Sequence, residues 1–470
     1  MTGDSIMKMI TKLAGAALAL CIAGSQYSGG AAELPSAAGS GGDGLYRTFA
    51  ADLGNAGLSR TSPGGDADGL YRAFTTTGDS LYHPFAVGPG VINLSPADSL
   101  ADRQWALRNN GRIRRTESRL NLDSLDHMYV HKDDGGDVDA VALPPVGPGN
   151  YDKINTDAVE GIDINILPAW DLYEKAENKR PVTVAIIDTG IDITHPDLKN
   201  AIWTNEDEIP DDGIDNDGNG YVDDVHGWNF YDGNNTLYTG ADDTHGTHAA
   251  GTISAGKGDG GMVGLTDNQY VKIMVLKALG SDEGKGNTQA VLDAIRYAEA
   301  NGASICNLSF GSNHSDEAIA QVIRDSKMLF VVAAGNGDDR ELGYNIDTTP
   351  VYPASLPYDN VLTVANLMFD GNLDESSNYG PKNVDIAAPG VYILSTASDH
   401  GYAHMSGTSM AAPMVTGVAA MVYSSRPDLD LIGVKNALLN SARKMDSLAG
   451  KVFSGGMLDA GTAMAYGSGN

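Results

Sequence analysis

Five short apolar runs constrain the fold of this chain more than any other feature. They are rich in β-branched residues and read VTVAII at 182–187, VKIMVLKAL at 271–279, ASICNLSF at 303–310, LFVVAA at 329–334 and VLTVAN at 361–366. Strands with no polar face suit a sheet that is covered on both sides. We therefore expect these runs to be the buried strands of one large sheet.

Helical patterns lie between and after the apolar runs. TQAVLDAIRYAEANG places Val291, Ile295 and Ala298 on one face, and Gly302 is placed to end the helix. DEAIAQVIRDS and MAAPMVTGVAAMVYSS are also typical of helices. Alternating strands and helices predict an α/β fold, a three-layer structure with a mostly parallel central sheet and helices on both faces. Ligand sites in such folds lie beyond the carboxyl ends of the strands.

The charge of the chain excludes two classes of partner. The 470 residues carry a net charge of −30, with a pI near 4.4. Such a surface repels nucleic acid and anionic lipid, whereas it suits divalent cations. The two cysteines, Cys21 and Cys306, cannot build a disulfide framework, and Cys306 lies within a predicted strand as a buried, inert thiol.

The first 25 residues are typical of a secretory signal peptide. Lys8 and Lys12 precede the apolar run LAGAALALCIAG, and small residues follow around Ala23. The run is too short to span a bilayer permanently, and no other stretch is long enough. Leu20 before Cys21 is too large for the lipoprotein pattern. We expect a secreted, extracellular protein with no membrane segment in its mature form.

Residues 26–100 are rich in Gly, Ser and Asp and contain a near-repeat. Its copies are DGLYRTF at 43–49, DGLYRAF at 68–74 and DSLYHPF at 79–85. A short docking motif is one interpretation, but a flexible tether or pro-segment with a few aromatic residues is favoured. Residues 101–163 form an amino-terminal extension with a Gly/Pro/Asp-rich connector at 132–150, and 164–466 form the main domain. We expect the mature form to be trimmed upstream of this domain.

Four polar residues stand at the ends of predicted elements. Asp188 ends the first strand, His245 begins a small-residue helix, Asn336 follows another strand and Ser409 begins the last long helix. Each has an ordinary alternative as a turn or cap residue. His245 and His248 could also ligate a metal, but no third ligand is evident, and His248 is plausible as a structural histidine.

Together these residue types are what acyl transfer requires. A serine hydroxyl needs a base to take its proton, a carboxylate fixes the histidine tautomer, and amide donors stabilise the oxyanion. The chain order Asp, His, Ser is not the order of α/β-hydrolases, and Gly407 to Ala411 lack the GxSxG elbow.

Six stretches match one known family in its own order. They are VAIIDTGIDITHPDL, HGTHAAGTISA, NLSFGS, VVAAGN, DIAAPG and GTSMAAPMVTG. The chain resembles the subtilisin-like serine peptidases over roughly residues 160–425. QWALRNNG at 104–111 also resembles the amino edge of some mature domains.

The resemblance implies a role for each matching residue. Asp188 is the orienting carboxylate, His245 the general base and Ser409 the nucleophile, while Asn336 joins the Ser409 backbone N–H in the oxyanion hole. The edge strand containing Ser309, Phe310 and Gly311 would pair with extended substrate backbone. The implied activity is that of a serine endopeptidase of moderate selectivity that acts on proteins or peptides. We expect the protein to be a monomer.

An acidic insertion between Asp188 and His245 predicts calcium. DDGIDNDGNGYVDD at 211–224 spaces oxygen ligands as in the first half of an EF-hand loop, without its final Glu. The candidate ligands are Asp215, Asp217, Asn219, the carbonyl of Tyr221, and Asp223 or Asp224; a solvated acidic turn is the alternative. The resemblance also implies that Asp197 binds a second calcium with carbonyls of 256–262. Gly258 stands where the family often has Asn, and Asp259 would substitute for it.

Two other functions use the same fold. A transpeptidase or macrocyclase would share the acyl-enzyme but exclude water, and a non-catalytic calcium-binding protein would need no triad. The intact set of Asp, His, Asn and Ser argues against the second. Residues 26–100 contain no clear compact inhibitory pro-domain, although a zymogen is expected from the need for trimming.

Overall fold

The computed structural model describes residues 45–48, 98–120, 151–258, 260–280, 286–338 and 342–467. The predicted signal peptide, the connector at 132–150, Cys21 and Asp259 lie outside the described residues, as does most of the segment 26–100. Residues 45–48 differ from the favoured interpretation of a flexible tether, because they form strand β1 (Leu45–Thr48) in a small sheet with β7 (Gly286–Asn287) and β9 (Phe310–Gly311).

The central sheet of the described residues has the order β15-β16-β12-β11-β10-β8-β4-β6-β5. Its neighbouring strands are parallel except β15 with β16. In the pair of β4 with β6, Val182 lies opposite Val271 and Asp188 lies opposite Lys277. The predicted apolar runs form its central strands. The bounds are β4 (Val182–Asp188), β5 (Gly227–Asn229), β6 (Val271–Lys277), β8 (Ile305–Leu308), β10 (Leu329–Ala333), β11 (Val361–Leu367), β12 (Ile386–Pro389), β15 (Arg443–Lys444) and β16 (Gly456–Met457).

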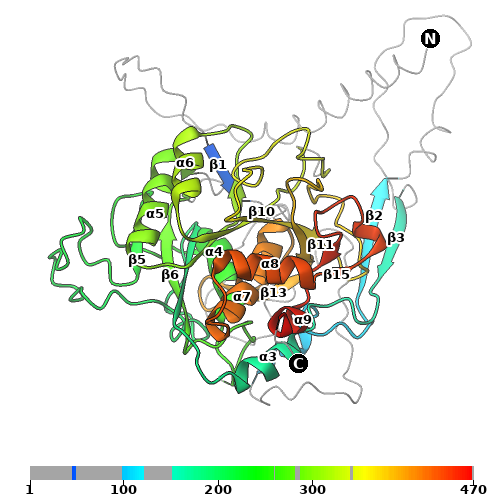
Figure 1. Cartoon of the computed structure of the whole chain (residues 1–470), viewed down its shortest axis with the longest axis horizontal. Helices are drawn as coiled ribbons and strands as arrows, with labels where there is room; N and C mark the ends of the chain where they lie inside the picture. The colour runs from blue at the N-terminus through cyan, green and yellow to red at the C-terminus, as the bar shows by residue number, and fades with distance from the viewer. Residues whose placement is uncertain are drawn as a thin grey trace, which may run out of the picture. The chain divides into compact units, whose positions relative to one another are not determined.

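Helices cover both faces of the sheet (Figure 1). One face packs against α3 (Ile166–Lys175), α4 (Thr244–Ser254), α7 (Thr408–Ser425), α8 (Leu431–Ser441) and α9 (Ala460–Ala465). The other packs against α5 (Thr288–Ala300) and α6 (Glu317–Asp325). Within β4, Val184 and Ile186 point into the first core, whereas Ala185 and Ile187 point into the second. This alternation explains why the strands are apolar throughout, and it confirms the three-layer α/β fold.

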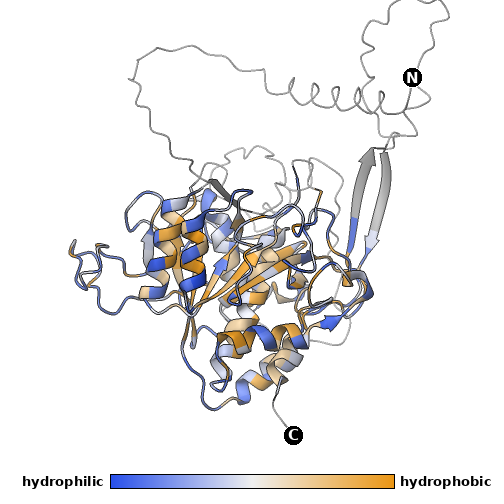
Figure 2. Ribbon diagram, turned by 45° about the horizontal axis from the view of Figure 1, so that its top comes forward, coloured by the Kyte–Doolittle hydropathy of each residue, from blue (hydrophilic) through white to orange (hydrophobic). Residues whose placement is uncertain are grey.

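The strands are the most hydrophobic layer, and the outer helices carry hydrophilic segments (Figure 2). Helix α5 begins after Asn287, whose side chain accepts a hydrogen bond from the N–H of Ala290. Past its end, Gly302 has a φ of +78°, a conformation that favours glycine. The predicted end of this helix at Gly302 is therefore confirmed.

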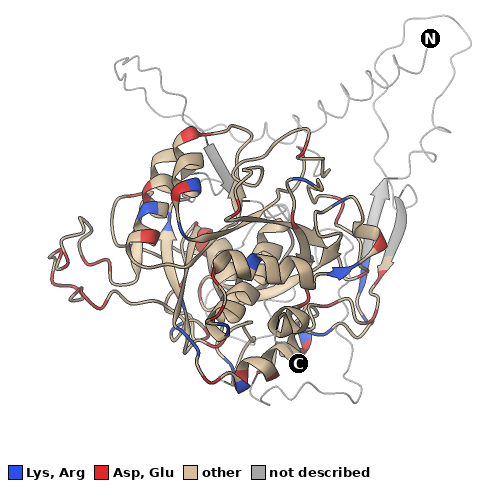
Figure 3. Cartoon of the chain, in the orientation of Figure 1, with Lys and Arg blue, Asp and Glu red and all other residues tan. Residues whose placement is uncertain are grey.

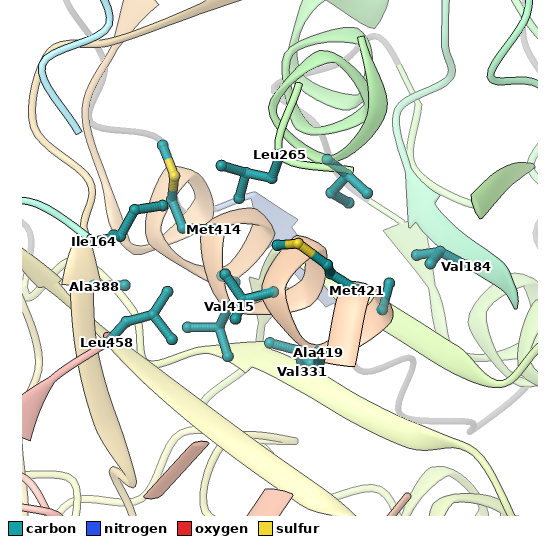
Figure 4. Packing of buried hydrophobic residues seen from close by; sticks show 14 of the residues in the cluster. Ile164, Val184, Leu265, Val331, Ala388, Met414, Val415, Ala419, Met421 and Leu458 are labelled. Atoms are coloured by element: carbon teal, nitrogen blue, oxygen red, sulfur yellow. The ribbon is translucent and has the colours of Figure 1, made fainter. Parts of the chain in front are cut away.

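Helix α7 lies inside the molecule rather than on its surface. Its residues from Thr408 to Val422 are buried. Met414, Val415, Ala419 and Met421 pack among side chains from several elements, as Figure 4 shows; these include Ile164, Val184, Leu265, Val331, Ala388 and Leu458. A helix that is apolar on all sides is buried on all sides. None of the described helices is long and apolar enough to cross a membrane.

The remaining elements are short or lie at the edge of the fold. They are η2 (Ala101–Arg103), β2 (Arg114–Leu120), β3 (Tyr151–Asp157), η5 (Ala241–Asp243), β13 (Ile393–Ala397), β14 (Gly401–Met405) and η6 (Asp446–Leu448). Residues just after η2 join the main core: Trp105 Nε1 donates to the carbonyl of Val391 at 2.8 Å, and Gln104 Nε2 donates to that of Val263 at 2.8 Å. The amino-terminal extension thus contributes side chains to the domain.

Candidate active site

Asp188, His245, Asn336 and Ser409 all stand where an element begins or ends. Asp188 is the last residue of β4, and Asn336 follows β10. His245 and Ser409 are each the second residue of a helix, α4 and α7, and these two helices pack against each other. The parallel sheet therefore places side chains from distant parts of the sequence at one edge.

Asp188 and His245 form a buried hydrogen-bonded pair. His245 Nδ1 lies 2.8 Å from Asp188 Oδ1, and the side chains are 7% and 1% exposed, respectively. A carboxylate can only accept, so Nδ1 carries the proton and Nε2 is left with its lone pair. Asp188 Oδ1 also accepts from the N–H of Thr189 at 2.7 Å, which fixes the carboxylate. This is the tautomer that a general base requires.

Ser409 is held against Ser309 by two hydrogen bonds. Ser409 Oγ donates to the carbonyl of Ser309 at 3.0 Å, and Ser309 Oγ donates to the carbonyl of Ser409 at 3.2 Å. Pro413 explains the second bond, because it has no N–H to give to the carbonyl four residues before it. The nucleophile candidate is thereby tied to the residue that immediately precedes β9.

Asn336 is oriented by Thr408. The side-chain oxygen of Asn336 accepts from the N–H and from Oγ1 of Thr408, both at 2.9 Å. Thr408 Oγ1 in turn accepts from the N–H of Gly335 at 3.1 Å. With its oxygen engaged, the amide of Asn336 presents Nδ2 as a donor. Thr408 was missed by sequence reasoning, although its place directly before Ser409 was a signal.

Three atoms of this site are buried without a hydrogen-bond partner in the described part of the chain. They are Asp188 Oδ2, His245 Nε2 and Asn336 Nδ2. Buried polar atoms are usually paired, so a cluster of exceptions requires an explanation. An unpaired amide donor is what the oxygen of a reacting carbonyl group would engage, and an unpaired ring nitrogen is what a hydroxyl would donate to.

Lys277 and Asp243 form a buried ion pair next to the site, and the sequence analysis did not predict it. Lys277 ends β6, and its Nζ donates to Asp243 and to the carbonyl of Thr189. Both side chains are at most 2% exposed. Asp243 directly precedes α4, so the pair joins the end of the sheet to the start of the helix that carries His245. The sequence signal for this pair was Lys277, a charged residue inside the apolar run VKIMVLKAL.

His248 is structural. It is fully buried, and its Nε2 donates to the carbonyl of Ile393 at 2.8 Å. Burial lowers the pKa of His248 to about 3, so the ring is neutral. Cys306 is buried in β8, and burial raises the pKa of its thiol, which keeps it unreactive.

The predicted substrate-binding stretch lies at an edge of the sheet layer. Ser309 joins β8 to β9, and β9 consists of Phe310 and Gly311. β9 does not pair with the central sheet but with β1, and β1 pairs on its other side with β7. Both pairings are antiparallel. The backbone of this stretch therefore pairs with an extended segment of the same chain.

The acidic insertion forms a loop that carries many of the Asp and Glu residues beside β5 (Figure 3). Carboxylate oxygens of Glu208, Asp215 and Asp217 lie within 4.8 Å of one another. Asp215 accepts from the N–H groups of Gly218, Asn219 and Gly220, at 2.7, 3.0 and 2.8 Å. Glu208 was missed because it precedes the Asp-rich motif.

The other predicted ligands of this loop lie around that cluster. The amide oxygen of Asn219 accepts from the N–H of Tyr221, whose ring packs on Tyr297. The carboxylate of Asp223 is engaged elsewhere, since it accepts from the N–H groups of Asp212 and Gly213. Glu208 is therefore a member of the carboxylate cluster that the predicted ligand set did not include, whereas the cluster does not include Asp223.

Asp197 is buried and already surrounded by protein donors. Its Oδ2 accepts from the N–H of Met262 at 3.1 Å and from the Tyr402 hydroxyl at 3.0 Å. The backbone approaches closely here, because a Cβ at Gly261 would lie 2.3 Å from the same oxygen. The turn that contains Gly256 and Met262 does border Asp197, as the predicted second calcium site requires.

Comparison with known proteins agrees with this geometry. The model of the subtilase family matches residues 179–469. Subtilisin-like protease 1 of Plasmodium berghei is 36% identical over 293 residues, which is 59% of this chain and 48% of that protein. The major intracellular serine protease of Bacillus subtilis is 33% identical over 266 residues, covering 56% and 74%.

Thermitase of Thermoactinomyces vulgaris is 32% identical over 302 residues, covering 63% of this chain and 92% of thermitase. The chain spans about half the length of the Plasmodium relatives it matches. The family match includes every element that carries Asp188, His245, Asn336 and Ser409. The chain therefore belongs to the subtilase family.

Proposed function

We propose that this subtilase is a serine endopeptidase that cleaves proteins or peptides through an acyl-enzyme on Ser409. The observation that carries the proposal is the hydrogen bond from His245 to Asp188, with His245 Nε2 buried and unpaired among the described residues. His245 takes the proton of Ser409 Oγ as the oxygen attacks the substrate carbonyl. Asp188 holds the tautomer and stabilises the cation that forms.

The oxyanion of this reaction is stabilised by Asn336 and by the backbone of α7. Asn336 Nδ2 is a buried donor, and the N–H of Ser409 lies in the first turn of α7, where the helix supplies no acceptor four residues back. The positive end of the helix favours negative charge at the same place. His245 then returns its proton to the leaving amine, and water hydrolyses the ester.

The test is activity of matched variants. Ser409→Ala and His245→Ala should each lower kcat/KM for peptide hydrolysis by about 10⁴-fold or more, and Asp188→Asn by about 10⁴ in kcat through the wrong tautomer. Ser425→Ala is the control, because this serine lies on the same helix and its hydroxyl donates within its own turn, to the carbonyl of Met421. Cleavage retained by Ser409→Ala would remove Ser409 from the mechanism.

We also propose structural calcium in the acidic loop. Three carboxylates with oxygens within 4.8 Å repel one another unless a cation lies between them, and oxygen ligands suit Ca²⁺. Glu208, Asp215 and Asp217 are the proposed core, with Asn219 and the Tyr221 carbonyl beside them. Asp197 and carbonyls of 256–262 would hold a second ion, as the family resemblance implies.

We further propose that the chain is secreted, acts outside the cell as a monomer, and is made as a precursor. The basic residues and apolar run of the first 25 residues support export. All four proposed site residues come from one chain, which supports a monomer. Sequencing the amino terminus of the protein recovered from culture medium, beside Ser409→Ala, tests export and self-processing together.

A further inference from the structure

Strand β1 belongs to the first copy of the near-repeat, DGLYRTF at 43–49. Its backbone pairs on one side with β7, Leu45 opposite Asn287 and Tyr46 opposite Gly286. On the other side it pairs with β9, Arg47 opposite Gly311 and Thr48 opposite Phe310. Residues 45–48 of the repeat are therefore the middle strand of a small sheet, in the place proposed for a substrate.

The register of β1 against β9 can be extended by one residue, to the position that contacts Ser409. In an antiparallel pair, the residue after the one opposite Phe310 comes opposite Ser309. The carbonyl of Ser309 accepts a hydrogen bond from Ser409 Oγ at 3.0 Å. A peptide held in this register thus brings its next residue to the nucleophile. In this chain the next residue is Phe49, so the bond that the register selects joins Phe49 to Ala50.

The spacing recurs in the other two copies. LYRTF at 45–49, LYRAF at 70–74 and LYHPF at 81–85 each place a phenylalanine three residues after a Leu-Tyr pair. Main-chain pairing alone accepts any extended peptide and gives no reason for repeated side chains. Recognition of the side chains themselves, at fixed distances from the scissile bond, accounts for both the register and the repetition.

We propose that the substrate site between β7 and β9 selects the motif Leu-Tyr-(Arg/His)-x-Phe and that the chain's own copies are its intramolecular ligands and substrates. This rests on the proposed peptidase function and adds its specificity. Cleavage follows Phe49, Phe74 and Phe85. At each, a bond forms from Ser409 Oγ to the Phe carbonyl carbon, the C–N bond breaks, the amine leaves with the proton from His245, and water releases the Phe carboxylate.

Synthetic peptides test the selectivity. The peptide of residues 43–54 should be cut between Phe49 and Ala50 with kcat/KM at least about tenfold above a scrambled peptide of the same composition, the discrimination expected from one filled apolar pocket. Tyr46→Gly and Phe49→Gly peptides should lose this advantage. Equal rates for the scrambled peptide, or cuts at other bonds, would overturn the proposal.

The full chain tests the processing. Ser409→Ala protein should retain its leader and should be cut by added wild type after Phe49, Phe74 and Phe85, as read by mass spectrometry. Phe49→Gly should lose the first cut, whereas Leu53→Gly, outside the motif, should keep it. Casein digestion and labelling of Ser409 by a fluorophosphonate run in parallel. If both succeed while the motif is ignored, the specificity fails and the peptidase stands; if both fail, the peptidase function itself is wrong.

Discussion

Asn336 shows how one side chain acquires a role from its neighbours. Its oxygen is engaged by Thr408, so its Nδ2 is the group left for a reacting carbonyl. We predict that Asn336→Ala lowers kcat by about 10²–10³ with KM little changed, because the donor acts on the oxyanion and not on the ground state. The measurement is kcat per titrated active site.

A turn residue would behave differently. In that case Asn336→Ala would lower stability but leave every folded molecule fully active. Thr408→Ser is the matched control, because it keeps the hydroxyl that orients Asn336 and should retain most of kcat.

His248 makes the fold sensitive to acid. Burial lowers the pKa of His248 from 6.5 to about 3. Below pH 6.5 the unfolded chain therefore binds a proton at this residue that the native state does not bind. Stability therefore falls as the pH drops from about 6.5 towards 3, by about 2 kcal/mol between pH 6.5 and 5. On a Ser409→Ala background that prevents autolysis, denaturant unfolding at the two pH values should show a smaller difference for His248→Gln.

The exposed His314 is the control for this experiment. His314→Gln should follow the wild-type pH dependence. If His248→Gln also follows it, burial of His248 is not a source of the acid sensitivity.

At the residue scale, the sequence predicted what lies within a motif and missed what depends on register. Asp188, His245, Asn336 and Ser409 stand in recognisable stretches at the ends of strands and helices. Lys277 is far from all of them in sequence, and only the pairing of β4 with β6 places it opposite Asp188. Glu208 joins Asp215 and Asp217 because the loop folds back, which a linear motif does not reveal.

At the scale of elements, the Lys277–Asp243 pair ties β6 to the start of α4. Lys277→Met leaves the Asp243 carboxylate buried without its ion-pair partner, which should cost about 3–5 kcal/mol of unfolding free energy. Lys277→Met/Asp243→Asn should recover most of the loss, because no uncompensated charge remains. Denaturant unfolding on the Ser409→Ala background measures both.

Lys272 provides the control on the same strand. Its Nζ donates to the carbonyl of Asn200 in an exposed position, so Lys272→Met should change stability by about 0.5 kcal/mol or less. An equal loss for Lys272→Met and Lys277→Met would show that burial of the pair is not what matters.

The acidic loop is the element whose stability should depend on calcium. An ion bound only to the native state stabilises it by about 2.7 kcal/mol at a hundredfold excess over Kd. The Tm of Ser409→Ala protein should fall in chelator and recover with Ca²⁺. Asp215→Ala/Asp217→Ala and Glu208→Ala should blunt the response, whereas the exposed Glu206→Ala should not. An unchanged Tm in chelator would leave the insertion as a charged loop.

At the scale of the whole molecule, the layered fold followed from the pattern of apolar runs. The central strands and α5, α6 and α7 lie where periodicity placed them, because local sequence and burial agree there. The two-residue strands β7, β15 and β16 carry no pattern of their own and exist through their partners, whereas β9 was expected from the family resemblance. β1 also forms through its partners, since the composition around it is typical of a tether and it pairs with residues that are distant in sequence.

The interior position of α7 has a consequence for the order in which the protein is made. Synthesis proceeds from the amino terminus, and β4, β8, β10, β11 and β12, on which α7 packs, all precede Thr408. Until α7 leaves the ribosome, the part of the apolar face that α7 covers is exposed, a state prone to aggregation. The helix that covers this face also carries Ser409. A growing chain therefore lacks its proposed nucleophile until these five strands have been made, and it cannot digest its own unfolded precursor before then.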